Sequence, residues 1–175
     1  MSDRFATEVT IGGNLPRKEV KNLAHAITQD GLGIEYQDKD SNELCLYILS
    51  AAAKKEPLSF SNTEVANGAT ENLERFCQTH ELSYVKRVEG KYEYNGEIHW
   101  WNPTMTEPKS WADTDIGAHQ PMLSRNTLQK LKDRGKTLEA ALEFLDSIAP
   151  PPPPLQFTSR KIRKVKSKPF DPFDL

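Results

Sequence analysis

The sequence predicts an α+β fold with the order β-α-β-β-α, then an antiparallel three-stranded meander, a C-terminal helical hairpin and a disordered tail. Three observations support this. Apolar and polar residues alternate near the N-terminus and again between residues 82 and 101, as in strands. Apolar residues recur at i, i+3, i+4 and i+7 in two other segments, which indicates amphipathic helices. The chain then ends in a proline-rich and strongly basic stretch, so we expect one domain over 1–149 and a tail over 150–175.

The N-terminal segment predicts a strand followed by a helix. Residues alternate from Phe5 to Ile11, and Gly12-Gly13 is expected to end that strand. A helix is predicted over 14–27, with Asn14 as its N-cap and Pro16 in its first turn. Its apolar stripe would be Val20, Leu23, Ala24 and Ile27.

The next segment predicts further strands and a second helix. Residues 34–36 indicate a short strand. Residues 43–49 (ELCLYIL) are apolar on both faces, which favours a central strand covered on both sides. Residues 58–60 are expected to pair briefly. A helix ending near Thr79, capped by Asn67 or Thr70, would then turn its apolar side chains inward: Leu73, Phe76 and Cys77.

The meander is predicted from residues 83–101. Residues 83–88 alternate, Glu89-Gly90 offers a turn, and residues 91–94 alternate again. Asn95-Gly96 suits a type I′ turn, which requires φ > 0 at both central positions. Residues 97–101 would then form the third strand.

A long polar connection over 102–121 precedes the predicted helical hairpin of residues 122–148. Ser124 and Thr137 are the expected N-caps. The second helix has an apolar stripe formed by Leu138, Ala141, Leu142 and Leu145. We expect the hairpin either to dock on the domain or to offer one face to a partner.

Composition limits the function classes. No apolar run approaches the roughly 18 residues of a membrane span, and the N-terminus lacks a secretory apolar stretch. Cys45 and Cys77 are too few for a disulfide framework, so a cytoplasmic protein with reduced cysteines and no membrane contact is expected. Residues 155–175 hold six basic and two acidic residues, net +4, which leaves 17 basic and 23 acidic residues, net −6, for the body. This asymmetry indicates an interaction segment.

The tail divides into three parts. Five prolines form a semi-rigid spacer, and a basic run follows that suits either a phosphate backbone or an acidic protein surface. The tip places two phenylalanines and a terminal leucine among carboxylates, as in short peptides captured by a hydrophobic pocket. The expected contact residues are Arg160, Lys161, Arg163, Lys164, Lys166, Lys168, Phe170, Phe173 and Leu175. The tail could instead fold back onto the acidic body.

The tip resembles two kinds of peptide. Its acidic and aromatic composition is similar to the partner-recruiting tip of bacterial single-strand-binding proteins. Its Asp-Pro-Phe triplet resembles peptides that endocytic adaptors recognise. Neither resemblance extends into the body, so they imply only that the tip is a peptide for recruiting or docking.

Three tryptophans are further candidates for partner binding. Trp100 and Trp101 point to opposite faces of a strand, so one is expected in the core. The other would pack under the 102–121 loop or serve as an exposed anchor, as would Trp111. Exposed rings beside Lys86, Arg87 and Lys91 would also suit stacking on a nucleobase.

Patterns that indicate catalysis are weaker in this sequence than those that indicate partner binding. Asp113, Asp115 and His119, with Glu107 nearby, offer groups for a divalent metal or for acid/base chemistry, but their spacing matches no zinc signature. Glu89-Gly90-Lys91 has the E-x-K form of many metal-dependent nucleases. No nucleotide-binding glycine loop is present, and neither a cofactor nor a metal is expected.

The sequence therefore favours a small, non-enzymatic intracellular binding or adaptor protein of the kind found in phages or plasmids. Its domain would contact one protein partner and its tail would supply a second contact. The alternative is a nucleic-acid-associated accessory factor that uses the basic tail and the aromatic sheet. The third hypothesis is a metal-dependent hydrolase or nuclease.

Overall fold

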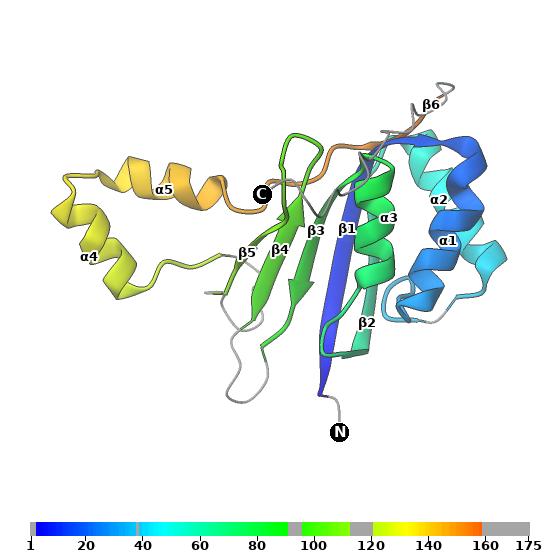
Figure 1. Ribbon diagram of the computed structural model, residues 1–175, viewed down its shortest axis with the longest axis horizontal. Coiled ribbons are helices and arrows are strands. Elements are labelled where there is room, and N and C mark those ends of the chain that lie inside the picture. The colour runs from blue at the N-terminus through cyan, green and yellow to red at the C-terminus, as the bar shows by residue number, and fades with distance from the viewer. Residues whose placement is uncertain (1–2, 38, 91–95, 113–120, 159–175) are drawn as a thin grey trace, which may run out of the picture.

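The computed structural model describes residues 3–37, 39–90, 96–112 and 121–158, and these residues form an α+β fold (Figure 1), as expected. The helices are η1 (Arg17–Glu19), α1 (Val20–Gln29), α2 (Ser41–Lys54), α3 (Glu71–Thr79), α4 (Arg125–Asp133) and α5 (Leu138–Asp146). The strands are β1 (Arg4–Pro16), β2 (Leu58–Ala66), β3 (Ser83–Val88), β4 (Glu97–Trp101), β5 (Lys109–Trp111) and β6 (Leu155–Thr158). No helix among these residues is both long and apolar enough to span a membrane.

One sheet holds the strands together. Its order is β2-β1-β3-β4-β5, and all neighbours in this path are antiparallel. Strand β1 is the longest, and its last four residues pair with β6 in parallel, from Gly13 opposite Leu155 to Pro16 opposite Thr158. The first and last strands of the described chain therefore lie side by side in one sheet.

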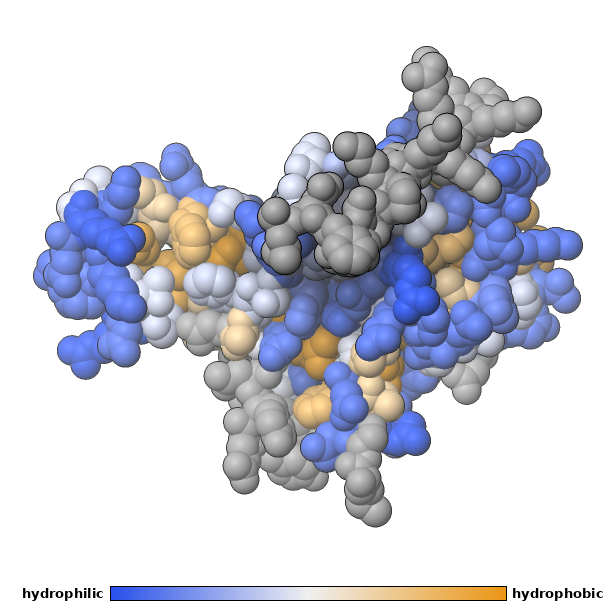
Figure 2. All heavy atoms as spheres, in the orientation of Figure 1, coloured by the Kyte–Doolittle hydropathy of each residue, from blue (hydrophilic) through white to orange (hydrophobic). Residues whose placement is uncertain are grey.

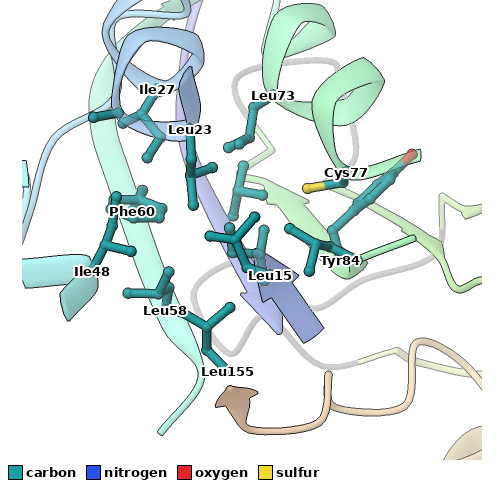
Figure 3. Packing of buried hydrophobic residues seen from close by; sticks show 14 of the residues in the cluster. Leu15, Leu23, Ile27, Ile48, Leu58, Phe60, Leu73, Cys77, Tyr84 and Leu155 are labelled. Atoms are coloured by element: carbon teal, nitrogen blue, oxygen red, sulfur yellow. The ribbon is translucent and has the colours of Figure 1, made fainter. Parts of the chain in front are cut away.

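Helices α1, α2 and α3 contribute to the main core on one face of this sheet. Figure 3 shows their side chains pointing toward those of the sheet. Leu23 and Ile27 of α1 and Leu73 of α3 are fully buried, and Cys77 of α3 lies beside Tyr84 of β3. Burial of these apolar side chains is the main source of stability for the fold.

A second, smaller core covers part of the opposite face. Side chains alternate along a strand, so Val85, Ile98 and Trp100 point away from the helices. They pack against Ile148 and Ala149, which follow α5. This contact attaches the end of the helical hairpin to the sheet.

The prediction of a central strand over 43–49 is wrong, because these residues lie in helix α2. Asp40 begins that helix with a capping box: its carboxylate accepts from the amides of Asn42 and Glu43, and the Glu43 side chain accepts from the Asp40 amide. The helix buries Leu44 and Ile48, while Leu46 is exposed on the opposite side.

Two further N-terminal predictions need correction. Strand β1 does not end at Gly12-Gly13 but continues to Pro16, because β6 pairs with its last residues. The predicted 14–27 helix therefore begins only after a turn of 3₁₀-helix, although its apolar stripe is buried as expected. Residues 34–36 form a turn with isolated bridges rather than a strand.

The described structure continues past the expected tail boundary at residue 149, as far as Thr158. Residues 150–158, here called the proline strap, cross the end of the sheet and finish as β6. Pro152 and Leu155 are buried, and the Leu155 amide donates to the Glu56 carbonyl at 3.1 Å. The prolines thus fix an extended backbone against the domain rather than projecting the chain away from it.

The meander and the hairpin are confirmed in outline. Strands β3, β4 and β5 form an antiparallel meander, with Val88 opposite Glu97. The expected strand over 91–94 lies outside the described residues. The third strand is instead β5, within the predicted 102–121 connection. Helices α4 and α5 form the predicted pair.

Candidate binding surface

Helices α4 and α5 form an arm, residues 122–147, that projects from the sheet (Figure 1, left). The Ser124 hydroxyl accepts from the Thr127 amide at 3.2 Å, and the Thr137 hydroxyl accepts from the Ala140 amide at 3.3 Å. Both caps satisfy amides that a helix start leaves without partners. Gly135, at φ 67°, supplies the left-handed turn between the helices.

The arm buries very little of its own surface. No residue of α4 is buried, and Ala141 is the buried residue of α5. The two helices meet at Gly135 and make few contacts with each other or with the domain. Helices of nine residues are marginal in water without tertiary packing, so the arm lacks the contacts that would normally stabilise it.

Apolar side chains gather on the arm, as Figure 2 shows. Among the described residues, seven large hydrophobic side chains are exposed, and five of them belong to the arm. We call these five the arm surface: Met122, Leu128, Leu138, Leu142 and Phe144. Leu138 is 69% exposed and Leu142 is 52% exposed, and their i, i+4 spacing places them on one side of α5.

Trp111 fixes the base of the arm. Its indole Nε1 donates to the Met122 carbonyl at 3.2 Å, and its ring meets the Phe144 ring edge-on at 5.6 Å. Trp111 is half-buried and packs against the second core. Of the three predicted tryptophan contacts, it is therefore the one that adjoins the arm surface.

The arm carries opposite charges on its two halves. Residues 122–136 hold Arg125, Lys130, Lys132, Arg134 and Lys136 against one acid, Asp133, for a net charge of +4. Residues 137–147 hold three acids and no base, for a net charge of −3. Apolar side chains are thus flanked by a basic half and an acidic half.

Trp100 and Trp101 are both buried, so of the two alternatives for the second ring the structure favours the packed one over the exposed anchor. Trp100 lies in the second core and is 8% exposed. Trp101 lies in the main core, stacked 6.5 Å from the Tyr84 ring. The two rings do occupy opposite faces, as strand alternation requires.

Lys86 belongs to a buried polar network. Its ammonium lies 2.6 Å from Glu74, whose carboxylate also accepts from the Thr70 hydroxyl at 2.9 Å and from the Tyr84 hydroxyl at 3.2 Å. Burial raises the pKa of Tyr84, and the neighbouring Glu74 charge acts in the same direction. The network joins α3 to the sheet, and because Lys86 is buried and paired, its charge is not offered to a phosphate.

This network borders a hollow of about 440 Å³ between α3 and the sheet. Glu89 and His99 line it, and the His99 ring lies 2.8 Å from the Glu97 carboxylate. Within the part of the chain that the structure describes, no three His, Cys, Asp or Glu residues are placed to hold a metal ion. The described lining of the hollow therefore offers no such metal-binding group.

Several predicted site residues lie outside the described residues. They include Lys91 of the nuclease hypothesis and the loop residues Asp113, Asp115 and His119. They also include every predicted tail contact: Arg160, Lys161, Arg163, Lys164, Lys166, Lys168, Phe170, Phe173 and Leu175.

The arm surface itself was missing from the predicted site residues. The available signal was the stripe over 138–145 together with leucines on the preceding short helix. That pattern leaves open whether the stripe faces the domain or solvent, because the answer depends on how the hairpin attaches to the sheet.

No known protein family matches this chain, and no significant match appears among curated proteins or among solved structures.

Proposed function

We propose that this chain is a small, non-enzymatic binding or adaptor protein whose arm is its main protein contact. The observation that carries the proposal is the concentration of exposed apolar side chains on the arm. Exposed apolar surface of this kind, rimmed by charge, marks protein-binding sites. The tail of residues 159–175 supplies the second contact.

The energetics support a binding role for the arm. Each leucine transferred from water into an interface contributes about 1.5–3 kcal/mol. Leu128, Leu138 and Leu142 are exposed, so most of that free energy is still available for binding. A partner that covers them would also order two helices that have little packing of their own.

The nucleic-acid alternative has less support. It needs rings for base stacking and cations for phosphates, and Trp100, Trp101 and Lys86 are buried. The proposal of an accessory factor then depends on the basic run of residues 160–168, which favours counterion release. A reducing intracellular location, as in the cytoplasm of a cell that hosts a phage or plasmid, is proposed because Cys45 and Cys77 are unpaired.

The test is affinity capture from a cell extract with a tagged chain. Leu138→Asp with Leu142→Asp should remove a set of captured proteins, because two buried charges would replace two apolar contacts. Leu46→Asp is the matched control, since Leu46 lies on α2 and is 67% exposed against 69% for Leu138. Both variants should keep the circular dichroism of the core.

A chain truncated after Thr158 tests the second contact. We expect it to lose a different set of captured proteins from that lost by the arm variant. If the arm variant and the Leu46→Asp control capture the same proteins as the original chain, the arm is not the protein contact.

A further inference from the structure

We propose that the partner of the arm surface is a second copy of this chain, with α4 of one arm against α5 of the other. This inference rests on the proposed function of the arm as a protein contact. It is carried by the charge pattern of the arm, by its unpartnered helices and by the distribution of its leucines.

The charge pattern of the arm is self-complementary. Residues 122–136, the α4 half, carry a net charge of +4, and residues 137–147, the α5 half, carry a net charge of −3. In a two-fold dimer the same surface serves both chains, so any contact from α4 to the partner's α5 is made twice. Opposite charges then meet at both contacts, and the alternative that pairs α4 with α4 brings like charges together.

The leucines support the same pairing. Leu128 lies on α4, and Leu138 and Leu142 lie on α5. The two helices diverge from Gly135 and make few contacts with each other, and these three leucines remain exposed. In a second arm, α5 can pack its apolar side against that of α4, and α4 can pack against α5. In each case the partner helix has a similar length and belongs to the half of opposite charge.

The acidic tail tip is the rival occupant from within the chain. Its six residues hold two aromatic rings, one leucine and two aspartates, which would match the basic α4 half. The positive charge that would match the acidic α5 half lies in the basic run of residues 160–168, so the tail also has both signs of charge. We assign the surface to a second arm because it matches both halves and also brings the exposed leucines of two helices, and truncation of the tail separates the two occupants.

The direct test is sedimentation of the purified full chain over a wide range of concentrations. We expect a reversible monomer–dimer equilibrium that weakens as salt is added. Leu142→Asp should raise the dissociation constant on the order of a hundredfold, because each substitution acts twice in a symmetric dimer. Leu46→Asp should leave it unchanged.

Charge reversal tests the pairing of α4 with α5. One variant carries Arg125→Glu and Lys132→Glu, and the other carries Glu143→Lys and Asp146→Lys. Arg125→Glu and Asp146→Lys also suit the helix dipole, so the helices should persist. Each variant alone should be monomeric, and an equal mixture should form a heterodimer. A mixture that stays monomeric would overturn the pairing.

Truncation after Thr158 separates the arm from the tail. We expect the truncated chain to dimerise as the full chain does. Loss of the dimer on truncation would show that the tail pairs the chains, and an original chain that is monomeric at every concentration would equally overturn the inference. In either case, loss of captured proteins on Leu138→Asp with Leu142→Asp would still support the arm as a contact for another protein, so the two proposals can fail separately.

Discussion

Gly12 lies where the proline strap crosses β1, and it shows at the scale of one residue why the strap is part of the fold. A Cβ atom added at Gly12 would lie 1.7 Å from the Pro153 carbonyl oxygen, which is a backbone atom. We expect Gly12→Ala to lower the free energy of unfolding by about 1–3 kcal/mol, because the strap must move away. Chemical denaturation measures the change.

The control for this prediction is Thr10→Ala. Thr10 points to the same face of β1, two residues away, and is half-buried, with its hydroxyl 3.5 Å from that of Ser59. We expect a clearly smaller loss there. Equal losses at the two positions would indicate that residues 150–153 do not rest on Gly12 in solution.

His80 predicts a pH dependence of stability. Burial lowers its pKa below the ordinary value of 6.5, although Glu19 acts in the opposite direction and Lys18 adds to the lowering. In the part of the chain described, its Nδ1 has no hydrogen-bond partner. The folded protein therefore takes up a proton at His80 less readily than the unfolded chain does. The free energy of unfolding should fall as the pH drops below 6.5, and level off below the pKa of the folded state.

Urea denaturation across this pH range, with His80→Phe as the variant, checks the prediction. Phenylalanine keeps an aromatic ring beside Phe76, whose ring lies 4.2 Å from that of His80, but it cannot titrate. In this variant the free energy of unfolding should fall less steeply as the pH drops below 6.5. The Glu19 carboxylate acts at lower pH. The Asn22 side chain lowers its pKa, so its contribution to the free energy of unfolding is lost as the pH falls below 4.5. If the free energy of unfolding of His80→Phe falls just as steeply with pH, the pH dependence belongs to other groups. The control is His25→Asn, at an exposed side chain, which should leave this pH dependence unchanged.

At the scale of elements, helix α2 depends on a local signal at its start. The Asp40 carboxylate accepts from the Asn42 amide at 2.7 Å and from the Glu43 amide at 2.8 Å. We expect Asp40→Ala to lower the free energy of unfolding by about 1 kcal/mol, since it leaves those amides without their cap. Asn42→Ala, at an exposed side chain inside the helix, is the control and should change little in a thermal unfolding experiment. A negligible effect of Asp40→Ala would mean that tertiary packing alone sets the start of α2.

The same helix shows what sequence patterns could and could not predict. The α3, α4 and α5 helices and the β3 and β4 strands have clear local patterns or caps, and the structure confirms them. ELCLYIL is apolar in nearly every position, so periodicity alone does not distinguish a buried strand from a buried helix. The box formed by Asp40 and Glu43, followed by three alanines, was the signal that favours the helix.

The exposed arm surface and the buried Trp100–Trp101 pair were harder to predict for a different reason. Local pattern gives the stripe of α5 and the opposite directions of the two rings. Which side meets solvent depends on Ile148 and Ala149, which attach the end of the arm to Val85 and Trp100. That contact joins residues about fifty to sixty-five positions apart in the sequence, so no local pattern contains it.

At the scale of the whole molecule, the question is where the folded unit ends. Leu155 is fully buried among side chains of the main core, and Phe157 packs against that core with the Arg17 guanidinium 5.9 Å from its ring centroid. Strand β6 also extends the sheet along the last residues of β1. The folded unit therefore includes the proline strap, and the tail begins only after it.

Two truncations test this boundary. A chain that ends at Thr158 keeps β6 and should unfold at the same denaturant concentration as the full chain. A chain that ends at Ala149 loses Leu155 and the partner of Gly13–Pro16, so it should be strongly destabilised. Leu155→Ala provides the measurement if that shorter chain does not fold. We expect it to lower the free energy of unfolding by about 2–5 kcal/mol, against little change for Leu46→Ala at an exposed position. If Leu155→Ala and Leu46→Ala are equally stable, residues 150–158 do not pack on the domain. They would then be a free spacer between the acidic body and the basic tail.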